Sequence, residues 1–264
     1  MSPIRVGVFG AGGRMGSTVC RAVVDDPDLE LVAAVDPHHA GIDLRQVIGE
    51  GAGGLQIAGD ADALARSGAQ VAVDFTAATA ARANLSWCAT NKVHAVVGTT
   101  GLTPADLDTL RASFVDGVNC VVAPNFAIGA VLMMRFAELA APWFETAEVI
   151  ELHHDAKVDA PSGTAMLTVQ RMAAASDDWA ADPTTDNVVA GARGGDLGGI
   201  RVHSVRLRGL VAHQEVLLGT TGQTLSIRHD SHDRSSFMPG VLLAVKTVGD
   251  HPGLTVGLDT LLGL

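Results

Sequence analysis

Two adjacent histidines, a lysine and a Pro-Ser-Gly-Thr turn lie within the fifteen residues from Glu151 to Ala165. A histidine can deliver a proton near neutral pH, a lysine carries a compact positive charge, and the first turn of a helix offers free backbone N–H groups. Together these groups suit a site that holds a small dianion and gives it a proton. The segment is our candidate for the substrate side of an active site.

The residues before this turn fit a β-strand, Ala147–His153, in which alternate side chains share a face. Glu151 and His153 therefore lie side by side, and the carboxylate can orient the imidazole ring. We predict that His153 is the proton donor. His154 points to the other face, where it is either a substrate ligand or a core histidine. Lys157 falls in the following loop, where it suits a carboxylate or an imine nitrogen.

A helix is predicted over Ser162–Ala175, with Pro161 before it and Ser162 as its N-cap. The N–H groups of Gly163 and Thr164 then face outward and favour an anion. Capping alone explains Ser162 but not the nearby histidines and lysine. Three arginines, Arg201, Arg206 and Arg208, lie on or directly after a later predicted strand. The sequence leaves open whether they reach the site, and covering the sheet is the simpler role.

The N-terminal part of the chain carries a glycine-rich loop between a predicted strand and a predicted helix. The loop reads Gly10, Ala11, Gly12, Gly13, Arg14, Met15 and Gly16. Small residues at such a turn let a pyrophosphate approach the backbone and let the helix pack closely on the sheet. Twenty residues after Gly16, Asp36 ends the next strand, as expected for a dinucleotide site.

Asp36 is placed to accept hydrogen bonds from the adenosine ribose, which favours NADH because a carboxylate repels a 2′-phosphate. Pro37 stands where an arginine would suit that phosphate, although Arg14 or the solvated pair His38 and His39 could still attract it. We predict that NADH serves at least as well as NADPH.

Two further strand ends carry small or polar residues. Phe75 and Thr76 lie at the end of one strand, and Gly98, Thr99, Thr100 and Gly101 follow the next. Ligands of open parallel sheets bind beyond the carboxyl ends of the strands, so both segments are candidates for the nicotinamide half of the cofactor site. Ordinary turn formation is the alternative, since glycine and threonine also serve turns.

The order of apolar runs predicts an α/β fold, a Rossmann-like doubly wound parallel sheet followed by a second α+β domain. The first part alternates strands and helices. Its predicted strands are Ile4–Phe9, Leu29–Val35, Val71–Phe75, Val93–Val97 and Val118–Val122, with helices at Arg14–Val24, Ala77–Thr90 and Pro104–Phe114. The second part has a helix at Ala127–Ala141 and antiparallel strands at Ile200–Leu207, Gln214–Leu218 and Leu225–His229, before a last helix at Ser236–Val248.

Composition narrows the classes of protein. A hydrophobic fraction of 47% with 18% charged residues excludes a disordered chain. A net charge of −11 without a basic stripe argues against nucleic acid as a partner. The start of the chain lacks a secretory h-region and no run of 18 apolar residues exists, so we expect a cytoplasmic protein away from membranes. Cys20, Cys88 and Cys120 lie in apolar segments and are expected to be buried thiols.

These motifs resemble one family closely. Gly-Ala-Gly-Gly-Arg-Met-Gly, Asp-Phe-Thr, Gly-Thr-Thr-Gly, Ala-Pro-Asn-Phe and above all Glu-Leu-His-His-Asp-Ala-Lys-Val-Asp-Ala-Pro-Ser-Gly-Thr-Ala are similar to the 4-hydroxy-tetrahydrodipicolinate reductases, also called dihydrodipicolinate reductases, of bacterial lysine and diaminopimelate synthesis. The similarity runs from Ile4 nearly to the C-terminus. The histidine–lysine motif is specific to that family, whereas the glycine loop occurs in many.

The resemblance implies roles for particular residues. It implies that His153 donates the proton, that Lys157 is the second catalytic or substrate-fixing cation, and that His154, Gly163 and Thr164 bind the carboxylates of a small cyclic dicarboxylate. It also implies NADH or NADPH bound by residues 10–16, Asp36, Gly98, Thr99, Thr100, Ala123, Pro124, Asn125 and Phe126, to which the strand-end position adds Phe75 and Thr76. Residues 1–126 and 237–264 would form the dinucleotide-binding domain and residues 127–236 a substrate-binding and tetramerisation domain, giving a homotetramer.

Two other functions compete with this interpretation. One is an NAD(P)-dependent dehydrogenase for a different amino-acid intermediate, such as an aspartate or homoserine dehydrogenase. The other is a non-catalytic regulator that senses a dinucleotide, which would bind NADH without oxidising it and would need no histidine–lysine pair beside an anion site.

Overall fold

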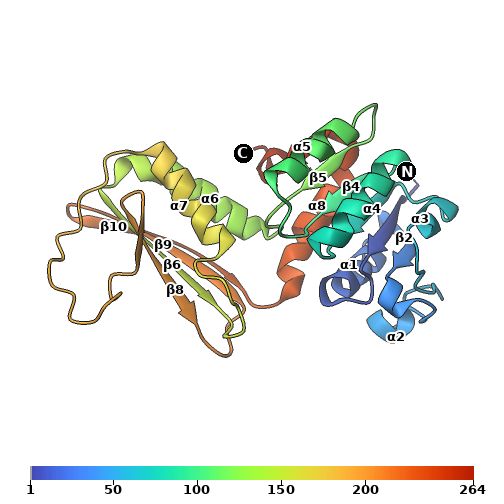
Figure 1. The fold of residues 1–264 in the computed structure, drawn as a ribbon, viewed down its shortest axis with the longest axis horizontal. Coiled ribbons are helices and arrows are strands. Elements are labelled where there is room, and N and C mark those ends of the chain that lie inside the picture. The colour runs from blue at the N-terminus through green and yellow to red at the C-terminus, as the bar shows by residue number, and fades with distance from the viewer. Residues whose placement is uncertain (1) are drawn as a thin grey trace. The chain divides into compact units, whose positions relative to one another are not determined.

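The computed structural model describes residues 2–264, and the chain forms two compact units. Unit 1 is Met1–Phe126 together with Phe237–Leu264, and unit 2 is Ala127–Ser236. Figure 1 shows a sheet with helices in each of them.

Unit 1 contains a six-stranded sheet in the order β11-β5-β4-β3-β1-β2, and every neighbouring pair is parallel. Its strands are β1 (Ile4–Phe9), β2 (Leu29–Val35), β3 (Val71–Asp74), β4 (His94–Val97), β5 (Cys120–Val122) and β11 (Leu254–Val256). Most of their side chains are buried, as expected when helices cover both faces. The Rossmann-like parallel sheet predicted from the sequence is confirmed.

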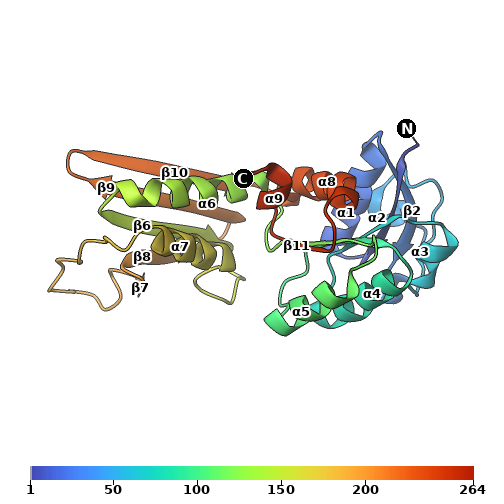
Figure 2. The same cartoon turned by 90° about the horizontal axis from the view of Figure 1, so that it is seen from above.

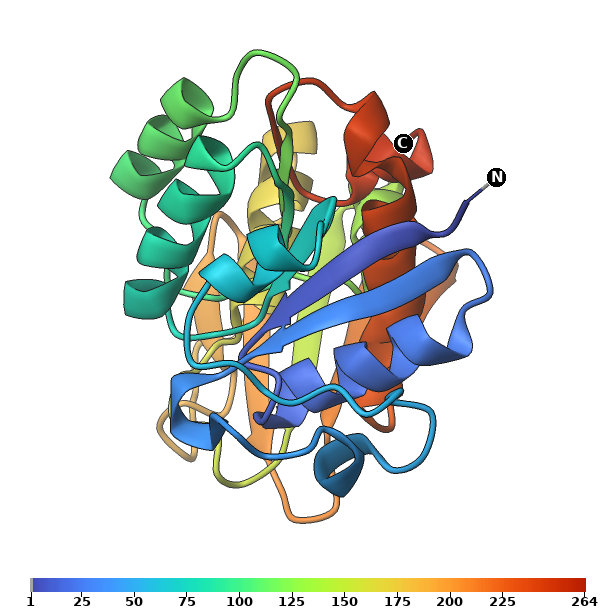
Figure 3. The ribbon, with the colours of Figure 1, turned by 90° about the vertical axis from the view of Figure 1, so that its right-hand side faces the viewer.

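Helices lie on both faces of this sheet (Figure 3). They are α1 (Arg14–Asp25), α4 (Ala78–Thr90), α5 (Pro104–Ser113) and α8 (Met238–Thr247), while the short helices α2 (Arg45–Ile48) and α3 (Asp62–Arg66) lie between β2 and β3. α4 packs against α5, and α1 packs against α8. A Thr103–Asp106 capping box with Pro104 after it explains why α5 begins where it does. The buried thiols predicted at Cys20, Cys88 and Cys120 are confirmed, and all three are free.

The C-terminal segment belongs to unit 1, where β11 pairs with β5 and buried Asn119 binds the segment before it. The Asn119 side-chain amide donates to the Val248 carbonyl at 2.9 Å and to the Gly249 carbonyl at 3.0 Å. Its oxygen accepts the Gly253 N–H at 3.0 Å, just before β11. The sequence did not predict β11, because three residues after a Pro-Gly turn are too few for a recognisable strand pattern. No helix within residues 2–264 is long and apolar enough to cross a membrane.

Unit 2 contains a five-stranded sheet in the order β10-β9-β6-β8-β7, with two helices packed on one face (Figure 2). The strands are β6 (Thr146–His153), β7 (Gly195–Leu197), β8 (Ile200–Arg206), β9 (Ala212–Thr220) and β10 (Gln223–Ser231), and the helices are α6 (Ile128–Ala140) and α7 (Gly163–Ala175). Buried Val149, Met172 and Val216 are central to the apolar core between sheet and helices.

The prediction of an antiparallel arrangement in unit 2 was partly wrong. β9 is antiparallel to both β6 and β10, but β8 is parallel to β6, which separates it from β9. The reason is the connection: β6 leads into α7, and the chain then returns to the same sheet, which is the geometry of a helical crossover between parallel strands. β9 and β10 are also longer than predicted.

Candidate active site

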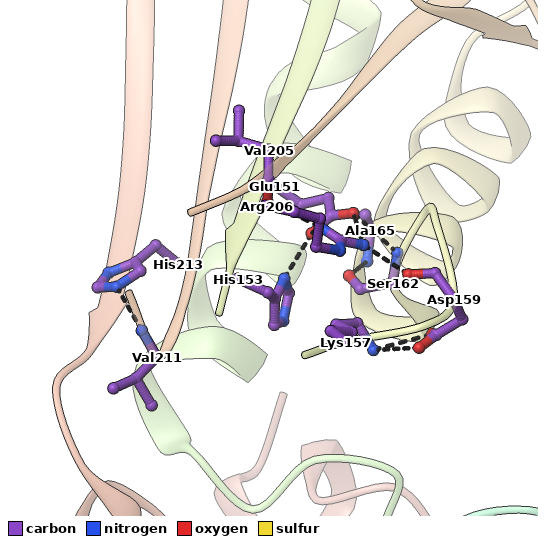
Figure 4. Close-up of polar contacts among 10 residues, drawn as sticks. All are labelled: Glu151, His153, Lys157, Asp159, Ser162, Ala165, Val205, Arg206, Val211 and His213. Atoms are coloured by element: carbon purple, nitrogen blue, oxygen red, sulfur yellow. Dashed lines mark hydrogen bonds and ion pairs between the residues drawn. The ribbon is translucent and has the colours of Figure 1, made fainter. Parts of the chain in front are cut away.

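The pair Glu151 and His153 lies at the end of β6, on the face of the sheet that α7 covers. His153 Nδ1 lies 2.5 Å from Glu151 Oε2 (Figure 4). The Glu151 side chain is 0% exposed and that of His153 16% exposed. The buried Glu151 carboxylate accepts a hydrogen bond from Nδ1 and so fixes the ring. Nε2 is then the nitrogen that can exchange a proton with a ligand. The predicted orientation of His153 by Glu151 is therefore present.

Arg206 binds the same carboxylate from β8. Its Nη1 donates to Glu151 Oε2 at 2.9 Å and its Nη2 donates to Oε1 at 2.8 Å. Such a bidentate ion pair compensates for the free-energy cost of burying the carboxylate charge. The backbone N–H of Ser162 also donates to Glu151 Oε1, at 3.2 Å.

These contacts set the protonation of both groups. Burial raises the pKa of Glu151, but hydrogen bonds from Arg206, Ser204 and His153 outweigh it and hold the pKa below its usual range. Burial lowers the pKa of His153 below its ordinary value, against the pull of Glu151, and the charges of Lys157 and Arg206 act in the same direction as burial. The free protein thus keeps an ionised Glu151 beside a largely neutral His153 near neutral pH.

Lys157 lies in the loop between β6 and α7, as predicted. Its ammonium group donates to both carboxylate oxygens of Asp159, at 2.7 Å and 2.8 Å, and its side chain is 20% exposed. This ion pair holds the pKa of Asp159 below its usual range. No sequence pattern indicates Asp159 as the partner of Lys157. Among the nearby residues, His154 is exposed, so the alternative of a core histidine is wrong.

The start of α7 closes the site. Ser162 is its N-cap, as predicted, and the Ser162 hydroxyl accepts the Ala165 N–H at 3.2 Å. Gly163 is exposed, and a methyl group added there would meet no atom within 4 Å, so the helix start is open to a ligand. Gln214 on β9 donates to the Thr168 hydroxyl at 2.7 Å, and Thr168 donates to the Thr164 carbonyl at 2.8 Å. The first turn of α7 is thereby tied to the sheet.

The site lies where the helix-covered face of the sheet changes from apolar to polar. One row across strands β8, β6, β9 and β10 is apolar and consists of Val202, Val149, Val216 and Ile227. The next row on that face is polar and consists of Ser204, Glu151, Gln214 and His229. The row after it pairs Arg206 with His153. The apolar row packs into the core of unit 2, and the two polar rows contain the candidate site residues Glu151 and His153.

The three arginines left open by the sequence behave differently. Only Arg206 shares the face of His153, and its contact with Glu151 shows that covering the sheet is the wrong role for it. Arg201 lies on the opposite face and pairs with Asp182 at 2.9 Å. Arg208 pairs with Asp155 at 2.9 Å and is 92% exposed. The signal that identifies Arg206 is the parallel register of β6 and β8, which pairs it with His153.

In unit 1 the glycine loop has the geometry of a phosphate cradle. Gly10 has a φ of +69°, in the left-handed region that favours glycine. A Cβ at Gly16 would lie 2.0 Å from the Gly10 carbonyl oxygen, so only glycine lets α1 start against the loop. Gly13 caps α1 without any side-chain hydrogen bond, which leaves the N–H groups of the first turn to a ligand.

Asp36 is 6% exposed and fixes this loop. Its carboxylate accepts the Gly12 N–H at 3.1 Å and the His38 N–H at 3.0 Å. The His39 ring lies against Gly12, with Nδ1 3.1 Å from Asp36 Oδ2, so His39 is not a freely solvated loop histidine.

A buried carboxylate, Asp74, draws the other two strand ends together. It accepts hydrogen bonds from the Thr76 N–H at 2.8 Å, from the Thr76 hydroxyl at 2.7 Å and from the Thr99 hydroxyl at 2.9 Å. The Phe75 ring fills the space over Gly98, where a Cβ would lie 2.0 Å from it. Thr99 is 6% exposed, so its hydroxyl serves Asp74 and only its backbone remains for a ligand.

The remaining predicted cofactor residues lie on the segment after β5. The Phe126 ring packs on Phe75 with 5.7 Å between centroids. Ala123 is buried, Asn125 is half-buried, and Pro124 is exposed, as is Thr100 after β4. Within residues 2–264 no cluster of three or more histidine, cysteine or acidic side chains could hold a metal ion.

Comparison with known proteins identifies the family. Residues 4–126 match the family model described as dihydrodipicolinate reductase, N-terminus, and residues 129–262 match dihydrodipicolinate reductase, C-terminus. The chain therefore belongs to the dihydrodipicolinate reductase family. Family members named 4-hydroxy-tetrahydrodipicolinate reductase are 52% identical in Cutibacterium acnes, covering 99% of both chains, and 50% identical in Streptomyces coelicolor, covering 100% of both.

A solved structure supports the same family. The dipicolinate-bound dihydrodipicolinate reductase from Paenisporosarcina sp. TG-14 superimposes with a TM-score of 0.83 at 38% identity, covering 98% of this chain and 99% of that one. An amine dehydrogenase from Mycobacterium smegmatis shares the fold alone, with a TM-score of 0.66 at 14% identity over 98% of this chain and 96% of that one. Dihydrodipicolinate reductase membership thus favours the predicted reductase over the two competing functions.

Proposed function

We propose that the chain reduces 4-hydroxy-tetrahydrodipicolinate to tetrahydrodipicolinate, with NADH or NADPH, in the synthesis of diaminopimelate and lysine. The observation that carries the proposal is the arrangement of Glu151, His153 and Lys157 beside the open start of α7. The Lys157 ammonium and the N–H groups at the start of α7 can bind the two carboxylates of a dicarboxylate, and His153 can donate the proton that the reduction requires. The family assignment supplies the reaction that requires both.

The residues of unit 1 fit a nicotinamide dinucleotide. The cradle at Gly10 and Gly16 leaves no room for a side chain, and the first turn of α1 offers backbone N–H groups to a pyrophosphate. NADH or NADPH, when bound, supplies the hydride. We assign the cofactor to the predicted residues from the glycine loop, Asp36, Phe75, Thr76, the Gly98–Thr100 backbone and the Ala123–Phe126 segment.

The cofactor preference follows from Asp36. Asp36 Oδ2 accepts the Gly12 N–H and lies 3.1 Å from His39 Nδ1, whereas Oδ1 accepts only the His38 N–H and keeps a lone pair for a ribose hydroxyl. A fixed negative charge there disfavours a 2′-phosphate. NADH is therefore expected to serve at least as well as NADPH. Steady-state rates with both cofactors test this, and a strong preference for NADPH contradicts it.

The substrate side falls to unit 2. His154, Gly163 and Thr164 bind the substrate carboxylates together with Lys157, which exchanges its contact with Asp159 for one with the substrate. A dianion beside His153 favours the imidazolium form, so the ring is protonated in the complex although its pKa is low in the free protein. Once the hydroxylated ring has lost water and the conjugated carbon has taken up the hydride, His153 gives the proton from Nε2.

The open face of the unit 2 sheet supports the proposed homotetramer. α6 and α7 cover only one face, and the other presents partly buried side chains that include Ile150, Leu152 and Val205. Such a face needs a partner layer, and a second copy of the chain supplies one. Size-exclusion chromatography with light scattering tests this, and a monomer at assay concentrations contradicts it. A biosynthetic NAD(P)H-dependent reductase is expected in the cytoplasm, which fractionation of expressing cells checks.

The decisive experiment generates the substrate in place from pyruvate and aspartate semialdehyde with a synthase of known activity, and follows the loss of NADH absorbance after the purified chain is added. We expect oxidation that depends on both precursors. A flat trace with an active synthase refutes the proposed function. NADH binding without oxidation would then favour a regulator, and oxidation with aspartate semialdehyde alone would favour a homoserine dehydrogenase.

A further inference from the structure

One guanidinium group joins several parts of the unit 2 site. Besides its two contacts with Glu151, Arg206 donates from Nη1 to the Val205 carbonyl at 2.8 Å and from Nη2 to the Asp159 carbonyl at 2.6 Å. Asp159 stands two residues after Lys157, in the loop that carries this lysine. Arg206 therefore links the end of β8 to Glu151 on β6 and to the loop that carries Lys157.

The carboxylate that Arg206 binds has two other partners. Glu151 Oε2 lies 2.5 Å from His153 Nδ1, and Oε1 accepts the Ser162 N–H at 3.2 Å, at the N-cap of α7 (Figure 4). All three elements that the proposed reaction requires thus meet at one ion pair. They are the proton donor, the loop with the cation, and the helix start that binds a carboxylate.

We propose that Arg206 is a positioning residue for the reaction: through Glu151 it holds the His153 ring and the start of α7, and through the Asp159 carbonyl it holds the loop of Lys157. The inference rests on the proposed function but goes beyond it, because Arg206 touches neither substrate nor cofactor in this role.

Electrostatics give Arg206 a second effect on the same residues. Without its charge, Glu151 would be a buried, uncompensated carboxylate beside His153. Such a neighbour holds a proton on the imidazole and raises the pKa of His153. The proton would then be held more tightly, and His153 would be a weaker acid. Arg206 therefore moderates the pull of Glu151 on His153 while it keeps the ring in place.

A lysine cannot replace this arginine. The planar guanidinium reaches both Glu151 oxygens, the Val205 carbonyl and the Asp159 carbonyl at once, whereas an ammonium group is a single point with three donors. Arg206→Lys keeps the positive charge but loses the bidentate contact with Glu151, while Arg206→Met loses both. The two variants separate geometry from charge.

Arg208 provides the matched control. It lies just beyond the same strand and also binds a carboxylate, that of Asp155, but it is exposed and takes no part in the contacts around Glu151. Arg208→Lys and Arg208→Met are expected to match the wild type in every measurement. The measurements are kcat, KM, calorimetric binding of pyridine-2,6-dicarboxylate, and an NMR titration of the His153 ring.

For Arg206→Lys we expect kcat to fall by roughly 10²-fold, the loss typical of a catalytic group displaced by about 1 Å. Dicarboxylate binding should weaken as well, because α7 and the Lys157 loop lose their anchor. For Arg206→Met the His153 titration should in addition move to higher pH by about one unit or more. A purely structural role would lower the melting temperature without moving that titration.

Arg206→Met leaves a buried charge unpaired and can fail to fold, so Glu151→Gln/Arg206→Met removes both charges together. This double variant should fold and still lose kcat, because its His153 ring has no ionised partner. Wild-type kcat in Arg206→Lys or in the double variant would overturn the inference, and so would an unchanged His153 titration in folded Arg206→Met. An inactive wild type would instead refute the proposed function, and the NMR titration, which needs no turnover, would still test Arg206.

Discussion

Among the described glycines of unit 1, Gly16 makes the closest approach to backbone, and it yields the most direct prediction about the cofactor. A Cβ at this position would lie 2.0 Å from the Gly10 carbonyl oxygen and 2.6 Å from the carbonyl carbon. Real Cβ atoms do not approach other heavy atoms within 3.0 Å, so in Gly16→Ala the helix and the loop must separate by about 1 Å. The contact is with backbone, so no side-chain rotation can relieve it.

The expected cost of Gly16→Ala follows from that displacement. Inserting a methyl group into a packed site typically costs about 1–3 kcal/mol in the free energy of unfolding. The same shift moves the N–H groups of α1 away from the pyrophosphate. NADH binding must then either restore the close packing against that strain or lose N–H contacts, and since each 1.4 kcal/mol is tenfold in affinity, we expect binding to weaken by roughly 10–100-fold. The assay is a fluorescence titration of NADH with the purified chain, without substrate, alongside thermal denaturation.

Two other glycines provide a graded comparison. Gly12→Ala places a Cβ 2.4 Å from the His39 ring, which can rotate away, so a smaller loss is expected. Gly249→Ala lies in the same unit with nothing within 4 Å and should match the wild type. If Gly16→Ala bound NADH with the affinity of Gly249→Ala while remaining folded, the assignment of this loop to the pyrophosphate would be refuted.

The remaining predictions concern the substrate side. His153→Ala should lower kcat by about 10²–10⁴-fold, the usual contribution of general acid catalysis, with unchanged NADH affinity by titration. Lys157→Ala should lower kcat and raise the substrate KM, and wild-type kinetics would contradict its role. Burial lowers the pKa of His153 in the free protein, so the protonated ring is lost as pH rises through a value below its ordinary one. In pH profiles kcat/KM should therefore fall at lower pH than kcat, because the bound dianion favours the protonated ring.

The sequence predicts unit 1 well, because its signals are local. The strands Ile4–Phe9 and Leu29–Val35 match β1 and β2 at both ends. Each is a short apolar run bounded by a turn, as in a sheet covered on both faces. The short α2 and α3 and the strand β11 were missed, since three to five residues carry no measurable periodicity.

The pairing in unit 2 could not be predicted in the same way. Alternation places Glu151 and His153 on one face from the sequence alone, and the structure agrees. The contact of Arg206 with Glu151 depends on the parallel register of β8 against β6. The crossover through α7 places 46 residues between these strands, Thr146–His153 and Ile200–Arg206. No local pattern encodes such a pairing. The Lys157–Asp159 pair was missed for the opposite reason, because loop geometry sets it.

Both units use a buried carboxylate at the end of a strand to gather loops, but they satisfy it differently. Asp74 is 1% exposed, and its partners at Thr76, Thr99 and Asn84 are all neutral donors, which suits a fixed scaffold under a cofactor. Glu151 is held by a charged arginine and by His153, the residue that we propose as the proton donor. A buried ion pair adds little stability over apolar packing, so stability alone does not account for the pair Glu151 and Arg206. In the proposed reaction, the pair keeps one negative charge in place while His153 gains and loses a proton.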